Sequence, residues 1–357
     1  MLLKRLAIVF LCGALIGPAD ARSRRPALMG NSVPIWVKSG ATVDMSFSTG
    51  QYYGCSLASC LSITRGSSKT NLLPSSASGF IYSTFGNNVL AITPGSGLLV
   101  EEGRTNQLLN SAAPATQTTG SLGTGTYTLW VNGSGSATMS LGTGVGCGTG
   151  TATNGTPVNF TITVAGTCIV TVIGSLNFEQ LELGTFGTSG IVTTGAAATR
   201  AADIIKLTST PSFGAAYSIF VQANPQAPSS YSQNQAAVGI TDGSANNRLQ
   251  LYRTSATGNA GALVSSGGVA QYNQTNGSWA QNVSGKMAAA ITSGDQESAF
   301  NGVLLTAGTG AFMPVSVNTV TIGALIGTSA AFDGFIQRVA IWPATRISNT
   351  NLQAFTT

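Results

Sequence analysis

Segments in which apolar and polar residues alternate make up much of the chain, and glycine, proline or asparagine separates them. In TYTLWVN (126–132), the side chains of Tyr127, Leu129 and Val131 fall on one face of an extended strand, and the residues between them fall on the other. PVNFTITV (157–164) repeats this alternation, and CIVTVIG (168–174) and NFEQLELG (177–184) continue the series as two further strands. Several short alternating segments divided by turn residues predict an all-β protein built from β-sandwiches or jelly rolls.

A second series of such segments follows in the C-terminal part of the chain. Its members are YSIFVQA (217–223), NRLQLYR (247–253), KMAAAIT (286–292), AFNGVLL (299–305), VNTVTIG (317–323) and FDGFIQRVAIW (332–342). The last is apolar on both faces apart from Gln337 and Arg338, which predicts a strand covered on both sides. Only SNTNLQAF (348–355) has the pattern of a helix, with Ser348 as its N-cap.

These two series define the predicted domain organisation. Residues 22–110 form a basic lead-in and a short β-rich segment, residues 111–205 form a jelly-roll-like sandwich, and residues 206–357 form a second sandwich. The first sandwich opens with SAAPATQTTGSLGTG (111–125), whose small polar residues are typical of a boundary. The predicted fold class is therefore all-β, with two sandwiches behind an N-terminal segment.

Composition argues against catalysis. Charged residues are 8% of the 357 residues, whereas a soluble domain usually carries about 25%. The chain has no histidine, which excludes Ser-His-Asp and Cys-His catalysis and any histidine-liganded metal site. The net charge of +5 reflects basic residues concentrated near the N-terminus, and elsewhere they are scattered singly. Without a basic stripe, we expect no nucleic-acid partner.

The N-terminus has the order of a secretory signal: Lys4 and Arg5, then the apolar run LAIVFLCGALIG, then the small residues ADA at 19–21. We expect 1–21 to be a signal peptide that is cleaved after Ala21, with a buried helix of the mature fold as the alternative. The apolar run is too short for a permanent transmembrane helix, and no later stretch is long enough, so we expect no stable membrane span.

Removal of that leader also removes Cys12 and leaves an even set of cysteines, Cys55, Cys60, Cys147 and Cys168. An exported protein can oxidise them. Three pairings are open, and we favour the two that join cysteines close in sequence, Cys55–Cys60 and Cys147–Cys168. The alternative is a four-thiolate zinc site, which no CxxC spacing supports.

Two pairs of carboxylates are the candidates for acid–base chemistry. Glu101 and Glu102 are neighbours, so an extended chain points their side chains to opposite faces. Glu179 and Glu182 are three residues apart, so their side chains also fall on opposite faces of a regular strand. Glycosidases need two carboxyls that face each other at about 5 to 9.5 Å. We therefore interpret Glu101 and Glu102 as structural, with one of them accepting hydrogen bonds from the backbone or from Arg104. No catalytic residue is predicted.

Two further polar groups have local interpretations. Arg200 and Asp203, at a spacing of three, predict a local ion pair or turn bond at the domain junction. Asp242, with Asn246 and Asn247, could offer oxygen ligands to a calcium ion, but a calcium site usually has two or more carboxylates. We favour a polar turn held by an Asx hydrogen bond and expect no cofactor.

Candidate binding residues combine aromatic rings, which cover the apolar face of a pyranose, with amide and guanidinium groups, which bond to hydroxyls. Those on polar strand faces or in polar segments are Trp130, Arg248, Gln250, Tyr252, Tyr272 and Trp279. The alternative for each is burial, because tryptophan is usually buried and neighbouring elements can cover both faces of a sandwich. Trp36 and Trp342 lie in apolar runs and are interpreted as packing residues.

Two sequence blocks carry a family resemblance. GLLVEEGRTNQLLNS (97–111) and NFEQLELGTFGTSGIVTTGAAATRAAD (177–203) together resemble a tailed-phage and prophage structural family of tail-fibre or head-spike-like proteins. The C-terminal part, including ITDGSANNRLQLYR (240–253), resembles the concanavalin A-like (laminin G-like) sandwiches found in such proteins. The resemblance implies a non-enzymatic virion or surface protein whose lectin-like sandwiches bind a cell-surface glycan or polysaccharide.

One feature departs from that family, because phage particles assemble in the cytoplasm and a virion part needs no export signal. The chain is either a domesticated, secreted prophage product, a virion protein whose true start is Met29, or a protein exported during an unusual assembly. Contacts with other virion or envelope proteins and a homotrimer fit this interpretation. The alternatives to adhesion are a purely architectural component without a ligand site and a divergent polysaccharide-degrading enzyme.

Overall fold

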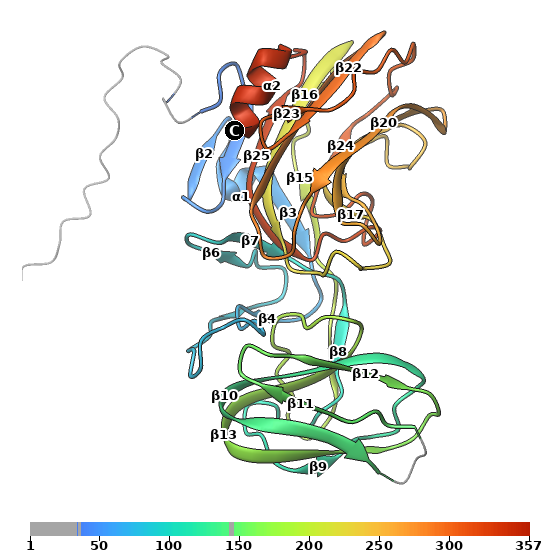
Figure 1. The fold of residues 1–357 in the computed structure, drawn as a ribbon. Coiled ribbons are helices and arrows are strands. Elements are labelled where there is room, and N and C mark those ends of the chain that lie inside the picture. The colour runs from blue at the N-terminus through green and yellow to red at the C-terminus, as the bar shows by residue number, and fades with distance from the viewer. Residues whose placement is uncertain (1–33, 35–36, 143–145) are drawn as a thin grey trace, which may run out of the picture. The chain divides into compact units, whose positions relative to one another are not determined.

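The computed structural model describes residues 34, 37–142 and 146–357 (Figure 1). Strands dominate it, which confirms the all-β fold class. The predicted signal peptide, Met29 and Trp36 lie outside the described residues. Among the residues that are described, no helix has the length and apolar character needed to cross a membrane.

Two large antiparallel sheets form the main sandwich. The nine-stranded sheet contains β1 (Val43–Ser46), β2 (Gln51–Tyr53), β6 (Ile92–Thr93), β7 (Gly97–Val100), β16 (Ala216–Pro225), β21 (Gly285–Thr292), β22 (Asp295–Phe300), β23 (Val303–Leu304) and β25 (Gly334–Trp342). The seven-stranded sheet contains β3 (Leu61–Thr64), β15 (Ile204–Leu207), β17 (Gln235–Thr241), β18 (Arg248–Arg253), β19 (Asn259–Ser266), β20 (Val269–Ser278) and β24 (Thr319–Ile322). The largest hydrophobic core draws on strands of both sheets.

The N-terminal strands belong to this sandwich, and this differs from the predicted division at residue 110. Strand β25 pairs with β16 along one edge and with β1 and β7 along the other, while β3 pairs with β15. Strand β25 is apolar on both faces, as its sequence predicts, and it lies in the interior of the sheet with paired neighbours on both edges. Residues before 110 supply these neighbours, so the part predicted as 111–205 interrupts the sandwich in the sequence.

The interrupting part is a five-stranded sheet built on a long antiparallel pair. It contains β9 (Gln117–Thr118), β10 (Gly125–Leu141), β11 (Gly150–Thr153), β12 (Val158–Ile162) and β13 (Cys168–Leu183). Tyr127, Leu129 and Val131 lie together in its core, as predicted. CIVTVIG and NFEQLELG were expected to be separate strands, but both fall within β13.

A register shift in this long pair comes between Asn132 and Gly133 of β10. Gly133 has φ +127°, and a Cβ there would lie 2.7 Å from the backbone of Leu176 and Asn177. Asn177 is the extra residue of β13 at this bulge, and an extra residue exchanges the two faces of a strand. As a result Val170 before the bulge and Leu181 after it both reach the same core.

The remaining elements are small. They are β4 (Lys69–Thr70) paired with β5 (Thr84–Phe85), β8 (Arg104–Asn106) paired with β14 (Ala198–Arg200), and the helices α1 (Leu57–Cys60) and α2 (Asn349–Thr356). The hydroxyl of Ser348 accepts a hydrogen bond from the Asn351 N–H, so the predicted helix and its cap are confirmed. The disulfides Cys55–Cys60 and Cys147–Cys168 are the two pairings that the spacing favoured.

Candidate functional site

Buried ion pairs join the two sequence blocks at the junction between the main sandwich and the five-stranded sheet. Lys69 Nζ lies 3.0 Å from Glu101 Oε2 and 2.5 Å from Asp203 Oδ2. Arg65 pairs with Asp203 at 2.7 Å, and Arg200 pairs with Glu101 at 3.2 Å. These five residues, which we call the junction cluster, are all buried.

Glu101 and Glu102 therefore have structural roles, as predicted. Glu101 accepts hydrogen bonds from the N–H and hydroxyl of Ser189. Burial alone would raise the pKa of Glu101, but Arg200, Lys69 and Ser189 together lower it to about 2. Glu102 pairs with Arg104, the partner that the sequence suggested, and accepts a hydrogen bond of 3.0 Å from the Tyr231 hydroxyl.

The predicted local pair between Arg200 and Asp203 is wrong. Asp203 accepts from the N–H of Glu101 at 3.0 Å and pairs with Arg65 and Lys69, whereas Arg200 pairs with Glu101. The physical reason is that strand β14 takes the chain across the junction, where partners distant in sequence are closer than local ones. Both residues do form ion pairs at the junction, as expected, but each pairs with residues other than the predicted one.

Glu179 and Glu182 lie on opposite faces of β13, as their spacing predicts. Glu182 accepts hydrogen bonds from Trp130 Nε1, Gln180 Nε2 and the N–H of Thr188. Glu179 faces the core, where burial raises its pKa to about 7. Both carboxylates are fully buried, so neither presents an oxygen to a substrate in solution.

Trp130 is in the core, not on the polar outer face that its strand pattern suggested. Its ring stacks on Phe178 with 5.3 Å between centroids and packs with Leu72. Its indole N–H donates to Glu182 Oε1 at 3.2 Å. The residues that follow β4 and β13 cover this face of the sheet, and a single strand cannot reveal that covering.

The predicted binding face of β18 is also covered. Arg248 is half-buried, Gln250 is 4% exposed and Tyr252 is 7% exposed. The ring of Tyr252 packs with Ala236 and Leu325. The segment after β24, which contains Leu325, lies over the outer face of the seven-stranded sheet and excludes a ligand from it.

Tyr272 and Trp279 belong to the largest core, so the expectation of exposed rings is wrong for them as well. The Tyr272 hydroxyl lies 2.8 Å from the Ser298 hydroxyl, and the Trp279 indole N–H donates to the carbonyl of Ala223 at 3.2 Å. Their polar neighbours in AQYNQTNGSWAQN suggested a surface segment. That segment contains most of β20, whose alternation sends the polar residues outward and Tyr272 inward.

Asp242 forms the predicted Asx turn. Its Oδ1 accepts from the N–H and hydroxyl of Ser244, and its Oδ2 accepts from Asn247 Nδ2 at 2.8 Å. These hydrogen bonds lower the pKa of Asp242. Both carboxylate oxygens of Asp242 thus accept hydrogen bonds within the turn. Trp342 stacks on Phe355, as its interpretation as a packing residue requires.

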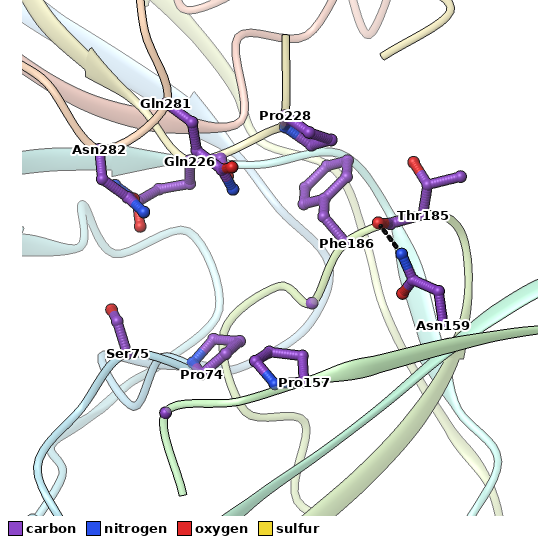
Figure 2. A pocket seen from close by; sticks show the side chains of 12 residues that line it. Pro74, Ser75, Pro157, Asn159, Thr185, Phe186, Gln226, Pro228, Gln281 and Asn282 are labelled. Atoms are coloured by element: carbon purple, nitrogen blue, oxygen red, sulfur yellow. Dashed lines mark hydrogen bonds between the residues drawn. The ribbon is translucent and has the colours of Figure 1, made fainter. Parts of the chain in front are cut away.

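A cleft that the sequence did not indicate opens where five loops meet (Figure 2). Its volume is about 310 Å³. The lining residues come from the 71–83 loop, the turn before β12 and its first residues, the segment after β13, the segment after β16, and the β20–β21 loop: Pro74, Ser75, Gly155, Pro157, Asn159, Thr185, Phe186, Gly187, Gln226, Pro228, Gln281 and Asn282. We call this the amide cleft.

Every described residue that lines the amide cleft is uncharged. Figure 2 shows the amides of Gln226, Gln281 and Asn282 on one side, with Pro74 and Pro157 opposite them. The side chains of Gln226 and Asn282 make no hydrogen bond within the described part of the chain, so their amide groups are available to a ligand. Each amide supplies both donors and an acceptor.

Close packing fixes the wall and base of this cleft. A Cβ at Gly187 would lie 2.7 Å from both Pro74 Cγ and Trp130 Cδ1, so only glycine allows these rings to approach. The ring of Phe186 meets Tyr231 edge-on at 5.3 Å, and the Arg104 guanidinium lies 4.9 Å from its centroid. Phe186 therefore lines the amide cleft and is held in place by residues of the neighbouring cleft.

That neighbouring cleft is larger, about 860 Å³, and we call it the charged cleft. Glu102, Arg104 and Tyr231 line it. These groups already bond to one another, and Arg104 also donates to the carbonyl of Leu183. Because a ligand would have to compete with these bonds, the free amides of the smaller cleft make it the better candidate site.

No signal in the sequence could have identified the amide cleft from one strand or one motif. Gln226 and Asn282 come from loops far apart in the chain, and each reads as an ordinary turn amide, while Asn159 reads as a polar position of a strand. The one available signal is the number of proline and amide residues in the segments between predicted strands. Such residues are typical of loops in general, so the signal has little specificity.

No protein-family model and no curated protein matches this chain. Among solved structures, it is similar to the CBM40 of the Ruminococcus gnavus IT-sialidase bound to α2,6 sialyllactose, with 17% identity over 41% of this chain and 85% of that one, at a TM-score of 0.35. It is also similar to domain 4 of a Geobacillus stearothermophilus GH43 extracellular arabinanase in complex with arabinotriose. The identity is 14% over 44% of this chain and 73% of that one, at a TM-score of 0.36. TM-scores this low carry no argument about the ligand.

Proposed function

We propose that this protein is a non-enzymatic surface adhesion protein that binds glycans in the amide cleft. The observation that carries the proposal is the combination of free amides with proline rings in one uncharged hollow. Sugars present hydroxyl groups around an apolar ring face, and these two kinds of protein group match them. The binding site is thus placed in a cleft between loops, in contrast to the sandwich faces predicted from the sequence.

The biological setting that we propose is the cell surface or a virion. The phage-type sequence blocks supply Glu101, Arg200 and Asp203 to the junction cluster, which positions the two parts that form the amide cleft. Two disulfides support an exported protein, because such bonds persist in oxidising compartments. A single cleft of this size gives weak binding, so adhesion would depend on several copies, for example in a homotrimer.

A glycan array tests the proposal directly. The full chain is displayed at high density on beads, which supplies the avidity that weak sites need. We expect binding to a subset of glycans and a loss of that binding in Gln226→Ala and Asn282→Gly. Asn282 has φ +60°, so glycine removes its amide while it keeps the backbone conformation.

Gln233→Ala is the matched control. Gln233 is an exposed glutamine that lines the charged cleft, so its loss should leave binding unchanged. If Gln233→Ala weakens binding and Gln226→Ala does not, the site lies in the charged cleft. If no glycan binds the multivalent protein, adhesion is rejected in favour of an architectural component.

A further inference from the structure

A second hollow, of about 530 Å³, adjoins the amide cleft. The two share Ser75, Gln226 and Asn282 as lining residues. The hollow also takes in residues from the start of the 71–83 loop, from the β6–β7 turn and from β25. Because three residues line both, the amide cleft and this hollow are immediate neighbours, and we call the two together the groove.

The second hollow has the same chemistry as the first. Its described lining residues are uncharged, and they include the amides of Asn71, Asn224 and Gln337. They also include Phe80, whose side chain is 37% exposed. An exposed aromatic ring beside amides is the arrangement that the sequence predicted at Trp130, whose ring is buried.

We infer that this groove binds an uncharged oligosaccharide chain several units long, with one unit against Phe80 and others in the amide cleft. The inference rests on the proposed function and names its ligand class. Two adjoining hollows can hold successive units of a linear chain, and the amides that line both can bond to the hydroxyls of adjacent units. The ring of Phe80 supplies a stacking surface in the second hollow.

The absence of charged groups among the described lining residues favours neutral glycans over acidic ones. A bound carboxylate loses water, and uncharged amide donors offset that loss less fully than a facing cation does. No cation is among the described residues that line the groove. Lys69, the cation nearest in sequence to the 71–83 loop, is buried and bound to Glu101 and Asp203. The groove therefore selects neutral chains.

The experiment measures affinity by calorimetry for soluble oligomers of increasing length. The neutral probes are oligomers of glucose, galactose and mannose, and the acidic probes are oligomers of galacturonic acid, which differ from the galactose series by a carboxylate. We expect affinity for at least one neutral series to rise with length, and the galacturonic acid series to bind at least tenfold more weakly than the galactose series.

Phe80→Ala tests the second hollow of the groove. It should weaken binding of the longest bound oligomer by about tenfold and leave the shortest one unchanged. Phe312→Ala is the matched control, because Phe312 is 67% exposed and lines neither hollow, and it should have no effect. Unchanged melting temperatures show that both variants are folded.

The outcomes separate this inference from the proposed function. Affinity that does not depend on length, a Phe80→Ala variant with wild-type affinity, or stronger binding of the acidic series overturns the inference. In each of these cases the proposed function stands if Gln226→Ala still abolishes glycan binding. A protein that binds neither these oligomers nor any glycan of the array overturns both.

Discussion

Arg65 NH1 and Asp203 Oδ1 form a 2.7 Å ion pair with no exposure of either side chain, although 138 residues separate them. The remaining N–H groups of Arg65 donate to the carbonyls of Ser67, Gly86 and Val89. The pair joins the chain just after β3 to the chain just before β15. Because β3 pairs with β15, with Thr64 opposite Ile204, the ion pair fixes the end of this strand pair at which the chain returns from the interrupting part.

Asp203→Asn should destabilise the fold by about 3–5 kcal/mol, because it leaves Arg65 and Lys69 buried with one carboxylate fewer. Urea denaturation followed by tryptophan fluorescence measures this loss. Asp295→Asn is the control: Asp295 pairs with Arg346 at 2.6 Å but is 54% exposed, so its loss should cost less than about 1 kcal/mol. Equal effects of the two substitutions would contradict a structural role for the junction cluster.

The dependence of stability on pH should have a maximum in mild acid. Glu179 has a pKa of about 7 in the folded state, above its ordinary value of 4.5, so folding binds a proton and stability falls as pH rises from about 4.5 to 7. Glu101 has a folded pKa of about 2, below 4.5, so its contribution is present above 4.5 and is lost as pH falls toward 2. Denaturation curves across this range locate the maximum.

Glu179→Gln assigns the upper part of that profile. The amide cannot ionise, so the variant should lose roughly 1–3 kcal/mol of the stability difference between pH 4.5 and 7. Gln117 Nε2 can still donate to the oxygen that remains, as it now does at 2.6 Å. A variant with the same slope as the wild type in this range would show that Glu179 is not the titrating group.

Much of the fold could be predicted from local alternation. The faces of β10, the strand β25 and the Ser348 cap follow from spacing alone, since side-chain direction repeats every two residues in a strand. The assignment of β1, β3 and β7 to the main sandwich does not, because pairing partners more than a hundred residues away leave no trace in a local pattern. The same limit explains why CIVTVIG and NFEQLELG were divided at what is a bulge within β13.

The candidate site was beyond the same reasoning. An alternating strand shows which residues share a face, but it does not show whether another segment covers that face, as the residues around Leu325 cover Tyr252. For Glu101 and Glu102, by contrast, the opposed directions of neighbouring side chains are intrinsic to an extended chain, so their structural roles were predicted correctly. Binding groups that converge from five loops have no such local constraint.

The two disulfides should contribute unequally to stability. Cys147–Cys168 closes a loop with a sequence separation of 21 and Cys55–Cys60 one with a separation of 5, and loop-closure entropy gives about 3 and 2 kcal/mol respectively. Paired Cys→Ala variants of each bridge, denatured in urea under identical conditions, test the order. A larger loss from the Cys55–Cys60 variant would contradict it.

Gly187→Ala should impair the amide cleft without any change in its hydrogen-bonding groups. The new methyl group would lie 2.7 Å from Trp130 Cδ1 and from Pro74 Cγ. Trp130 is held in the core, so Pro74 must shift, which moves one wall of the cleft. We expect a stability loss of about 1–3 kcal/mol and weaker glycan binding at temperatures where the variant is fully folded.

Gly120→Ala is the matched control, because a Cβ there would meet nothing within 4 Å. It should leave both stability and binding close to the wild type. If Gly187→Ala loses stability but binds glycan with unchanged affinity, the position of Pro74 is irrelevant to the ligand. That result would place the binding site away from the wall that Pro74 and Gly187 form, since an overpacked wall must alter the shape that a bound sugar meets.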